Sequence, residues 1–333
     1  MEKEKLTVLT EAGKQFGFGH ISRCLSICRY FEGSSISIEF IIDGDDSVLS
    51  LLKDHSFVLM QWLNNRSILK KLETSSFILI DSLRISDDQI RDIERLDAEI
   101  IYIDDEKRRN VLDSGFVLDW TVLADKKKYF TPKKEGITYL LGSKYTPLRQ
   151  PFEVSQKKTI SKKIKSVFIS FGGSDVRNLT PIVLSTLSKN FPSLEKNIIV
   201  GPGFENTQAI KSKADKNTKL IFNADAMEMS SVMQQSDIAI SSGGQTLYEL
   251  AYIGVPTVAV LLVENAREDT EGWAEVGAID YIGDFDDGDL MQKLVRSVNI
   301  LEDPVVRQNM KFSANRFIGV NGARLIVDAV LKR

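Results

Sequence analysis

Short apolar runs alternate with amphipathic stretches along almost the whole chain of 333 residues. In the first half, strand-like runs lie at 6–10, 37–42, 57–60, 77–81, 100–104 and 139–141. Helical patterns begin between them, near His20, Ser47, Arg66 and Ser86. Alternation of this kind is typical of βαβ units, so the first half predicts a parallel sheet with helices on its faces.

The same alternation begins again in the second half. Strand-like runs lie at 166–171, 198–200, 220–222, 238–241, 257–261 and 278–282, and three helical stretches follow from about residue 287. The chain is long for a single hydrophobic core and suits two domains. We therefore expect two doubly wound, Rossmann-like parallel-sheet domains, at 1–155 and 166–333, that face each other across a cleft.

Between the two halves lies "QKKTISKKIK", residues 156–165, half of which are lysines. A lysine-rich stretch can form a basic contact patch. Its position between two α/β halves favours a solvated linker instead.

Composition and charge narrow the class of protein. Apolar residues make up 43% and charged residues 27% of the chain, which is typical of a folded globular protein. The net charge of −3 argues against a nucleic-acid partner bound by bulk electrostatics. No signal-peptide pattern is present, and the longest apolar runs are too short to span a membrane. A cytoplasmic protein without a membrane span is expected.

The two cysteines, Cys24 and Cys28, lie four residues apart on one predicted helix. With Ile21 they form a stripe that suits a buried helix face better than a disulfide. His20 is the only obvious further metal ligand nearby, so no metal site is predicted. No cofactor is predicted either.

In doubly wound sheets, ligands bind outside the carboxyl ends of the strands. The first loop of this kind is "TEAGKQFGFGH", residues 10–20. Gly17 and Gly19 would let the backbone approach a ligand, although the third glycine of a dinucleotide motif is missing. His20, at the expected start of a helix, could take a proton near neutral pH. The alternative is a capping or structural histidine, whose charged form the helix N-terminus would disfavour.

The second loop is "FGGSD", residues 171–175. Gly172, Gly173 and Ser174 stand between a strand and a helix, where backbone N–H groups can bind an anion. The alternative is a tight turn in which Asp175 or Asn178 caps the helix, and both interpretations can hold together.

The third loop is "SSGGQTLYE", residues 241–249. Its serines and glycines at a second strand-to-helix turn suit a diphosphate. Glu249 lies about one and a half turns into the helix, where its carboxylate could bind a ribose diol or be an ordinary surface glutamate. A P-loop and a G-x-S-x-G nucleophile elbow are both absent.

Four blocks together resemble a known family: "GFGHISRCLSIC", "YLLGSKYTPLRQPF", "ISFGGSDVRNLT" and "SDIAISSGGQTLYELAYIGVP". They resemble the UDP-sugar hydrolases of pseudaminic acid synthesis and the spore coat polysaccharide biosynthesis proteins. This group shares the two-domain glycosyltransferase B fold with the N-acetylglucosaminyltransferase of peptidoglycan synthesis. The resemblance extends from the first loop to about residue 265.

The resemblance implies roles for individual residues. His20 matches the histidine thought to act on the attacking water, and Glu249 matches the acidic residue that binds the ribose. The matching ligand-binding positions are Gly172, Gly173 and Ser174 near the phosphates, Ser242, Gly243, Gly244 and Gln245 at the diphosphate, Met227 with Ala226 at the uracil, and Asn265 near the sugar.

The chain departs from the family at two places on the sugar side. Leu83, in Asp81-Ser82-Leu83, stands where the family tends to have a tyrosine. Asn265-Ala266 stands where the family usually has Asn-Gln. Arg84 and Arg267 are candidates to replace the lost contacts, or else ordinary surface arginines.

The leading hypothesis is a metal-independent hydrolase of a nucleotide-activated amino sugar, most simply a UDP-sugar. In this hypothesis water attacks the anomeric carbon and His20 is the base. The alternatives are a glycosyltransferase that uses the same donor, and a nucleotide-sugar binding protein that has lost catalysis.

Overall fold

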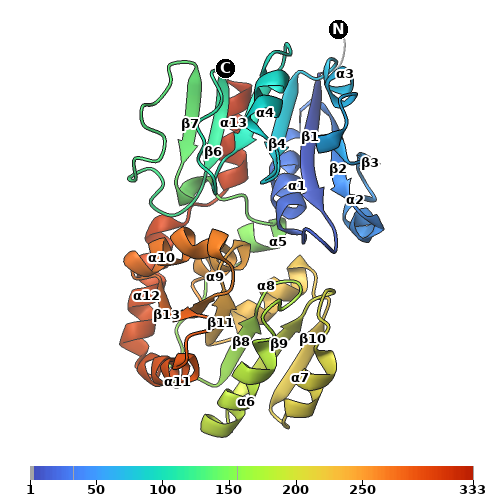
Figure 1. Cartoon of the computed structure of the whole chain (residues 1–333). Coiled ribbons are helices and arrows are strands. Elements are labelled where there is room, and N and C mark those ends of the chain that lie inside the picture. The colour runs from blue at the N-terminus through green and yellow to red at the C-terminus, as the bar shows by residue number, and fades with distance from the viewer. Residues whose placement is uncertain (1–3, 33, 156, 333) are drawn as a thin grey trace. The chain divides into compact units, whose positions relative to one another are not determined.

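The structure, a computed structural model, describes residues 4–32, 34–155 and 157–332. The chain divides into two compact units (Figure 1). Unit 1 comprises Met1–Arg149 and Val320–Arg333, and unit 2 comprises Gln150–Gly319. Each unit is built on its own parallel sheet.

The sheet of unit 1 has seven strands in the order β3-β2-β1-β4-β5-β6-β7, and all neighbours are parallel. The strands are β1 Lys5–Ala12, β2 Ser37–Gly44, β3 Ser56–Leu59, β4 Phe77–Asp81, β5 Glu99–Ile103, β6 Gly115–Asp119 and β7 Ile137–Leu141. Six of them confirm the predicted runs, and β6 is an additional strand.

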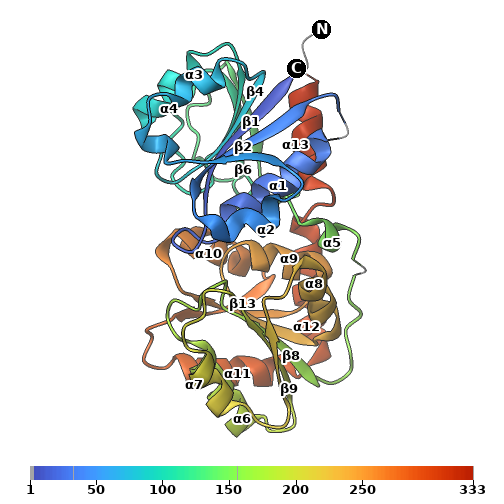
Figure 2. The same ribbon diagram turned by 90° about the vertical axis from the view of Figure 1, so that its right-hand side faces the viewer.

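The helices of unit 1 lie on both faces of this sheet. Figure 2 shows α3 and α4 on one face and α1 and α13 on the other. The helices are α1 Gly19–Phe31, α2 Leu49–Leu52, α3 Ile68–Leu72, α4 Asp87–Glu94 and α13 Gly322–Leu331, with 3₁₀ turns at Asp46–Val48, Trp62–Asn64 and Ser143–Tyr145. In α1, apolar residues at three- and four-residue spacing form the buried face, as the sequence predicts. Cys24 and Cys28 lie on that face as free, buried thiols.

The sheet of unit 2 has six strands in the order β10-β9-β8-β11-β12-β13, again all parallel. The strands are β8 Ser166–Ser170, β9 Glu195–Val200, β10 Thr218–Phe222, β11 Ile238–Ser242, β12 Thr257–Leu261 and β13 Ile279–Asp284. All six confirm predicted runs. The helices are α5 Gln150–Glu153, α6 Thr180–Asn190, α7 Thr207–Lys213, α8 Ala226–Gln235, α9 Gln245–Ile253, α10 Arg267–Glu275, α11 Leu290–Leu301 and α12 Pro304–Phe317, with a 3₁₀ turn at Glu264–Ala266.

The strand order places a switch point in each sheet. In unit 1 the chain moves from β1 to β2 on one side and later returns to β4 on the other, so β1 and β4 adjoin at the reversal. In unit 2 the reversal lies between β8 and β11. Ligands of doubly wound sheets bind outside the carboxyl ends of such strands. The three loops singled out in the sequence follow β1, β8 and β11, three of these four strands.

The division of the chain differs from the predicted boundaries at its C-terminal end. The sequence assigns 166–333 to the second domain, whereas residues 320–333 belong to unit 1. The helix α13 packs there against α1 and against the turn Ser143–Tyr145. Its buried face consists of small and aliphatic residues, including Ala323, Ile326 and Val330. The apolar face of this helix in the sequence predicts that the helix packs against other elements. It does not show to which unit those elements belong.

The predicted solvated linker at 156–165 is not a free connection. Its first residue, 156, lies outside the described residues. From Lys158 onward the segment is bonded to unit 2: the Lys158 amide donates to Ile253 O at 2.8 Å, and Asp237 accepts from the Lys165 amide at 2.8 Å. Ser161 donates to Asp237 at 2.7 Å. These hydrogen bonds hold the lysine-rich segment on unit 2. Its high charge therefore does not indicate a mobile chain.

Candidate active site

The loop after β1 is folded on itself by its glycines. Gly13 and Gly17 exchange backbone hydrogen bonds of 3.0 and 2.7 Å, and both have positive φ, 131° and 76°. A Cβ added at Gly17 or at Gly19 would meet no atom within 4 Å, so the space beside both residues is open. Gly19 is the first residue of α1 and His20 the second. The loop thus presents the imidazole at the carboxyl ends of the strands, as the sequence predicts.

His20 forms a pair with Asp81, the last residue of β4. Its Nδ1 lies 2.8 Å from Oδ1 of Asp81, and its side chain is 15% exposed. A carboxylate only accepts, so in neutral His20 the proton sits on Nδ1 and the lone pair on Nε2. Within the described part of the chain, no residue hydrogen bonds to Nε2. The arrangement therefore leaves a basic nitrogen available to a substrate.

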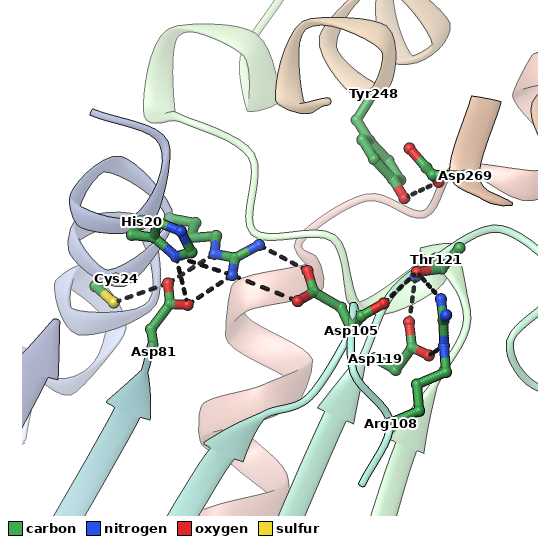
Figure 3. A network of polar contacts seen from close by, with 10 residues as sticks. His20, Cys24, Asp81, Asp105, Arg108, Asp119, Thr121, Tyr248 and Asp269 are labelled. Carbon is green, nitrogen blue, oxygen red and sulfur yellow. Dashed lines mark hydrogen bonds and ion pairs between the residues drawn. The ribbon is translucent and has the colours of Figure 1, made fainter. Parts of the chain in front are cut away.

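Arg23, one turn further along α1, holds the Asp81 carboxylate from the other side. Its Nε donates to Asp81 Oδ2 at 2.6 Å and its Nη2 to Oδ1 at 2.5 Å. Its Nη1 donates to Asp105 at 2.6 Å, and its guanidinium lies 5.0 Å from the ring centroid of Trp120. In Figure 3, dashed lines join Asp81 to His20 and, through the guanidinium group of Arg23, to Asp105. Nη2 also lies 3.2 Å from His20 Nδ1, but both are donors, and Asp81 accepts from both.

These contacts set the protonation of the pair. Burial disfavours the Asp81 carboxylate, but the charges of Arg23 and His20 outweigh burial and hold its pKa well below its usual range. For His20, burial lowers the pKa and Asp81 raises it, with Arg23 opposing, and the balance lies above the ordinary value. The helix N-terminus is expected to disfavour the charged imidazole, and the Asp81 carboxylate outweighs any such effect. His20 is not a capping residue either, since Phe18 is the N-cap and no side chain caps α1.

Replacing Arg23 should move the titration of His20. Arg23 lowers the pKa of the imidazole, so Arg23→Gln removes that effect and the pKa of His20 rises further above its ordinary value. The imidazole C–H signals can be followed by NMR between pH 5 and 9. The chain has two histidines, and a His55→Gln variant assigns them. A pKa of His20 that falls or stays fixed in Arg23→Gln would contradict this account.

Further buried carboxyl groups stand at the carboxyl ends of neighbouring strands. Glu11 of β1 accepts from Ser82, and burial raises its pKa. Asp119 of β6 accepts from Arg108 at 2.8 Å, and burial raises its pKa to about 6 (Figure 3). Asp104, directly after β5, is 2% exposed. This edge of the sheet is built to hold polar groups away from water, which is typical of functional sites.

In unit 2, the loop after β8 approaches the loop after β9 closely. The Gly203 amide donates to Gly173 O at 2.9 Å, and a Cβ on Gly201 would lie 2.3 Å from that oxygen. Gly172 and Gly173 have open space beside them, and with Ser174 they are exposed. Gly201 and Gly203 were not singled out in the sequence. Their signal, a Gly-Pro-Gly after a strand, is that of an ordinary turn.

An acid of this loop binds the start of the helix that follows it. Asp175 is buried and accepts from the amides of Leu179 and Thr180 at 2.9 and 3.0 Å. The N-cap of α6 is Leu179, so neither Asp175 nor Asn178 is the N-cap that the alternative predicts, although Asp175 binds the amides there. An anion at this loop would have to bind to the exposed residues 172–174, because α6 begins only at Thr180.

The loop after β11 leads directly into α9. Ser242 ends the strand, Gly244 is the N-cap with φ of 100°, and Gln245 begins the helix. The N-cap Gly244 has no side chain that could cap the helix, and α9 has no acid in its own first turn, so its N-terminus keeps the positive end of the helix dipole. Gly243 has a packing role: a Cβ there would lie 2.6 Å from Thr270 Oγ1 and 2.8 Å from Ala266 Cβ. Ala266 thus lies against the loop after β11.

The remaining predicted ligand residues lie in different environments. Glu249 on α9 is fully buried, so the surface-glutamate alternative is wrong. Met227 is 71% exposed in the first turn of α8, and Asn265 is exposed in the turn Glu264–Ala266. The contacts of these three residues with the ribose, the uracil and the sugar therefore stay predictions.

The two arginines proposed to replace lost sugar contacts are already engaged. Arg84 pairs with Asp43 at 3.0 Å and lies 4.8 Å from the ring centroid of Phe16. Arg267 pairs with Glu264 at 2.7 Å and with Asp284 at 2.6 Å. Both have the contacts of ordinary surface arginines, which was the alternative.

No helix in the part of the chain that the structure describes has the length and apolar character to cross a bilayer. Nor do three or more His, Cys, Asp or Glu side chains gather there in a metal-binding arrangement.

Comparison with known proteins gives one domain match and several distant relatives. Residues 166–275 match the glycosyltransferase family 28 C-terminal domain. The chain is 29% identical over 279 residues to the uncharacterized protein MJ1062 of Methanocaldococcus jannaschii, a match that covers 79% of this chain and 57% of that protein. The chain thus matches little more than half the length of that relative.

Two further relatives are matched over most of their length. Identity is 22% to the spore coat polysaccharide biosynthesis protein SpsG of Bacillus subtilis, with 81% of each chain covered. Identity is 24% to the UDP-2,4-diacetamido-2,4,6-trideoxy-beta-L-altropyranose hydrolase of Campylobacter jejuni, with 81% of this chain and 95% of that enzyme covered.

Solved structures agree on the fold. MurG of Acinetobacter baumannii is 13% identical with a TM-score of 0.71, over 99% of this chain and 100% of that one. The UDP-GlcNAc 2-epimerase of Neisseria meningitidis, bound to UDP-GlcNAc, is 14% identical with a TM-score of 0.64 over the same fractions. The chain therefore has a glycosyltransferase B-type fold, and its sequence is similar to the UDP-diacetamido-trideoxy-altropyranose hydrolases and to SpsG, as its motifs predict.

Proposed function

We propose that the protein is a hydrolase of a UDP-activated amino sugar that releases UDP and the free sugar. The observation that supports this most directly is the His20–Asp81 pair, which leaves Nε2 of His20 without a partner among the described residues. Similarity to an enzyme named as a UDP-sugar hydrolase supports the same reaction. We place the reaction in the synthesis of a nonulosonic acid or a surface polysaccharide, on the names of the relatives.

In the proposed reaction, Nε2 of His20 removes a proton from a water molecule as the water oxygen attacks the anomeric carbon. The bond from that carbon to the diphosphate oxygen breaks, and its electron pair leaves with UDP. Asp81 keeps the proton of neutral His20 on Nδ1 and stabilises the imidazolium that forms. A diphosphate is a good leaving group, so little general acid catalysis is needed.

Unit 2 has the features of the UDP site in this proposal. The open backbone at 172–174 and the uncapped start of α9 at 242–245 would bind the diphosphate. Glu249 would bind the ribose and Met227 would lie at the uracil. Asn265 would contact the sugar.

Gly244→Ala should weaken UDP binding. With φ of 100° and ψ of −163°, Gly244 has a conformation that L side chains rarely adopt, so the alanine distorts the start of α9. We expect a loss of UDP affinity of about tenfold, since the strain is on the order of 1–3 kcal/mol. Calorimetric titration measures this. The matched control is Gly288→Ala, where a Cβ also meets open space but φ is ordinary, and it should bind UDP normally. Equal affinity in both variants would remove this loop from the nucleotide site.

The test of the function is product analysis with the purified protein alone. Release of UDP and free sugar in equal amounts from a UDP-sugar supports hydrolysis. The donor is chosen by a thermal-shift panel of UDP-, GDP-, CMP- and dTDP-sugars, because a ligand of the folded form raises the melting temperature.

A glycosyltransferase is the second candidate, because residues 166–275 match a glycosyltransferase domain. In that case His20 would deprotonate an acceptor hydroxyl, and products would appear only when an acceptor is added. A protein that binds UDP-sugars without any turnover would instead be a binding protein.

A further inference from the structure

A small pocket opens at the carboxyl ends of β4 and β5, within unit 1. It is lined by Arg23 of α1, by residues 81–83 after β4 and by residues 102–107 after β5. The pocket shares Arg23 and Asp81 with the His20 pair, so it lies directly beside the candidate base. Its free volume is about 10 Å³, the space of one water molecule, so a small polar group of a molecule bound at His20 could enter it.

Most polar side chains that line the pocket are already engaged. Arg23 binds Asp81 and Asp105, and Ser82 donates to Glu11. Tyr102 accepts from Arg109, and Lys107 donates to the backbone oxygen of Leu83, which ties the loops after β4 and β5 together.

Asp104 is different. It is 2% exposed, and its Oδ2 accepts from the Asn110 amide at 3.2 Å. Its Oδ1 is buried and has no hydrogen-bond partner among the described residues. A buried acceptor without a donor is costly, and native proteins keep few of them without a functional reason. The partner of Oδ1 is therefore a water molecule or a donor group of a bound ligand.

The electrostatics of the pocket limit what that partner can be. Burial raises the pKa of Asp104 to about 7, with the Asn110 amide and Arg109 opposing and Asp105 adding to the rise. An N–H or O–H group from a ligand would favour the ionised carboxylate. The lining carries four acids, Asp81, Asp104, Asp105 and Glu106, and two cations, Arg23 and Lys107. A negatively charged group of a ligand would therefore be repelled.

We propose that Asp104 is a specificity-determining residue that binds a neutral hydrogen-bond donor, a hydroxyl or amide N–H, on the sugar of the nucleotide sugar. This inference rests on the proposed function and extends it to the substrate class. It selects neutral or N-acylated sugars and rejects acidic ones. It also replaces the expectation from the sequence, in which Arg84 and Arg267 are candidates for the lost sugar contacts.

The test compares nucleotide sugars with UDP itself. Calorimetric titrations use UDP, UDP-glucose, UDP-N-acetylglucosamine and UDP-glucuronic acid, in a His20→Ala background so that the donors survive the measurement. Each is repeated with Asp104→Asn, which keeps the shape of the side chain and an oxygen for the Asn110 amide. The control is Asp97→Asn, an exposed acid just before β5, at the opposite end of that strand. Thermal melting checks that each variant is folded.

We expect Asp104→Asn to reduce affinity for the better of the two neutral sugars by about 10- to 100-fold, the effect of one hydrogen bond to a charged group, and to leave UDP affinity unchanged. UDP-glucuronic acid should bind more weakly than UDP-glucose when Asp104 is present. In Asp104→Asn this difference in affinity should be smaller. Asp97→Asn should change nothing. Equal effects on UDP and the sugars, or no effect on either, would overturn the role of Asp104 and indicate a pocket that holds only water. Failure of UDP itself to bind would overturn the proposed function instead.

Discussion

Replacing His20 with alanine or asparagine should lower the turnover of a UDP-sugar by about 10²- to 10⁴-fold, the typical contribution of a general base. The reason is geometric: Nε2 is the nitrogen that the Asp81 contact leaves unprotonated in neutral His20. UDP affinity should be unchanged, because the residues proposed to bind UDP lie in unit 2 and His20 lies in unit 1. Single-turnover rates and calorimetric titration of UDP, made on the same preparation, separate the two effects.

The other histidine provides the control. His55 packs edge-on against Phe40, with ring centroids 5.3 Å apart, and its Nδ1 lies 3.6 Å from Glu32. His55→Gln removes an imidazole from the same unit without touching the pair at α1, so turnover should stay within about twofold of wild type. A His20 variant with full turnover would eliminate the mechanism proposed above. Loss of turnover together with UDP binding would show that His20 supports the fold of the site rather than its chemistry.

The sequence predicts the sheets of this protein well because their strands are short, apolar and separated by helical patterns. The strand it misses, β6 at Gly115–Asp119, has all five residues buried. It runs directly into a further buried stretch, 120–124, so no polar alternation or turn marks its end. Burial alone does not hide a strand, because β8, β11 and β12 are buried at all five residues and are predicted; in β6 the buried run simply continues past the end of the strand.

The candidate site could be predicted only in part, for a similar reason. His20 could be found because glycines precede it and a helix follows it. Asp81 is 61 residues away in the chain, and Asp105 lies 82 residues beyond Arg23. They meet only because β4 is the neighbour of β1 in the sheet. One local signal was available: His20 and Arg23 are three residues apart and share a helix face.

The pocket at Asp104 shows the limit of motif reasoning more plainly. Asp104 and Asp105 follow β5 as an unremarkable acidic pair in the sequence. Their roles diverge only through contacts, because Asp105 pairs with Arg23 while Oδ1 of Asp104 has no donor among the described residues. Which of two adjacent acids is engaged depends on the three-dimensional path of the loop and not on residue type.

Asp81→Asn should be at least as damaging as the loss of His20, although Asp81 is not proposed to touch the substrate. Arg23 donates Nε to Oδ2 and Nη2 to Oδ1, and Oδ1 also faces Nδ1 of His20, so an asparagine that gives its oxygen to Nε turns its NH₂ toward His20. Nδ1 of His20 then becomes an acceptor, and the proton moves to Nε2, which can no longer act as a base. The corresponding Asp-to-Asn change in serine proteases lowers turnover by about 10⁴-fold. The ¹⁵N chemical shifts of His20 report the tautomer directly, without any substrate.

The same variant should lose stability, by about 3 kcal/mol at pH 7, because the 12%-exposed Arg23 loses an ionised partner in a buried position. The pKa of Asp81 is lowered in the folded protein, so its contribution is complete above its unfolded pKa of about 3.9 and is lost as pH falls through the lower folded value. The difference in unfolding free energy between wild type and Asp81→Asn, measured in urea, should therefore shrink below about pH 4.

Asp105→Asn separates the tautomer from the ion pair. Asp105 binds Nη1 of Arg23, and no hydrogen bond joins it to His20, so this variant also weakens the ion pair while Asp81 still accepts from Nδ1. We expect it to lose stability but to keep the Nδ1–H tautomer and turnover within about tenfold of wild type. If Asp105→Asn and Asp81→Asn reduced turnover equally, the essential feature would be the charge balance around Arg23. If only Asp81→Asn does so, the essential feature is the orientation of a single proton on His20.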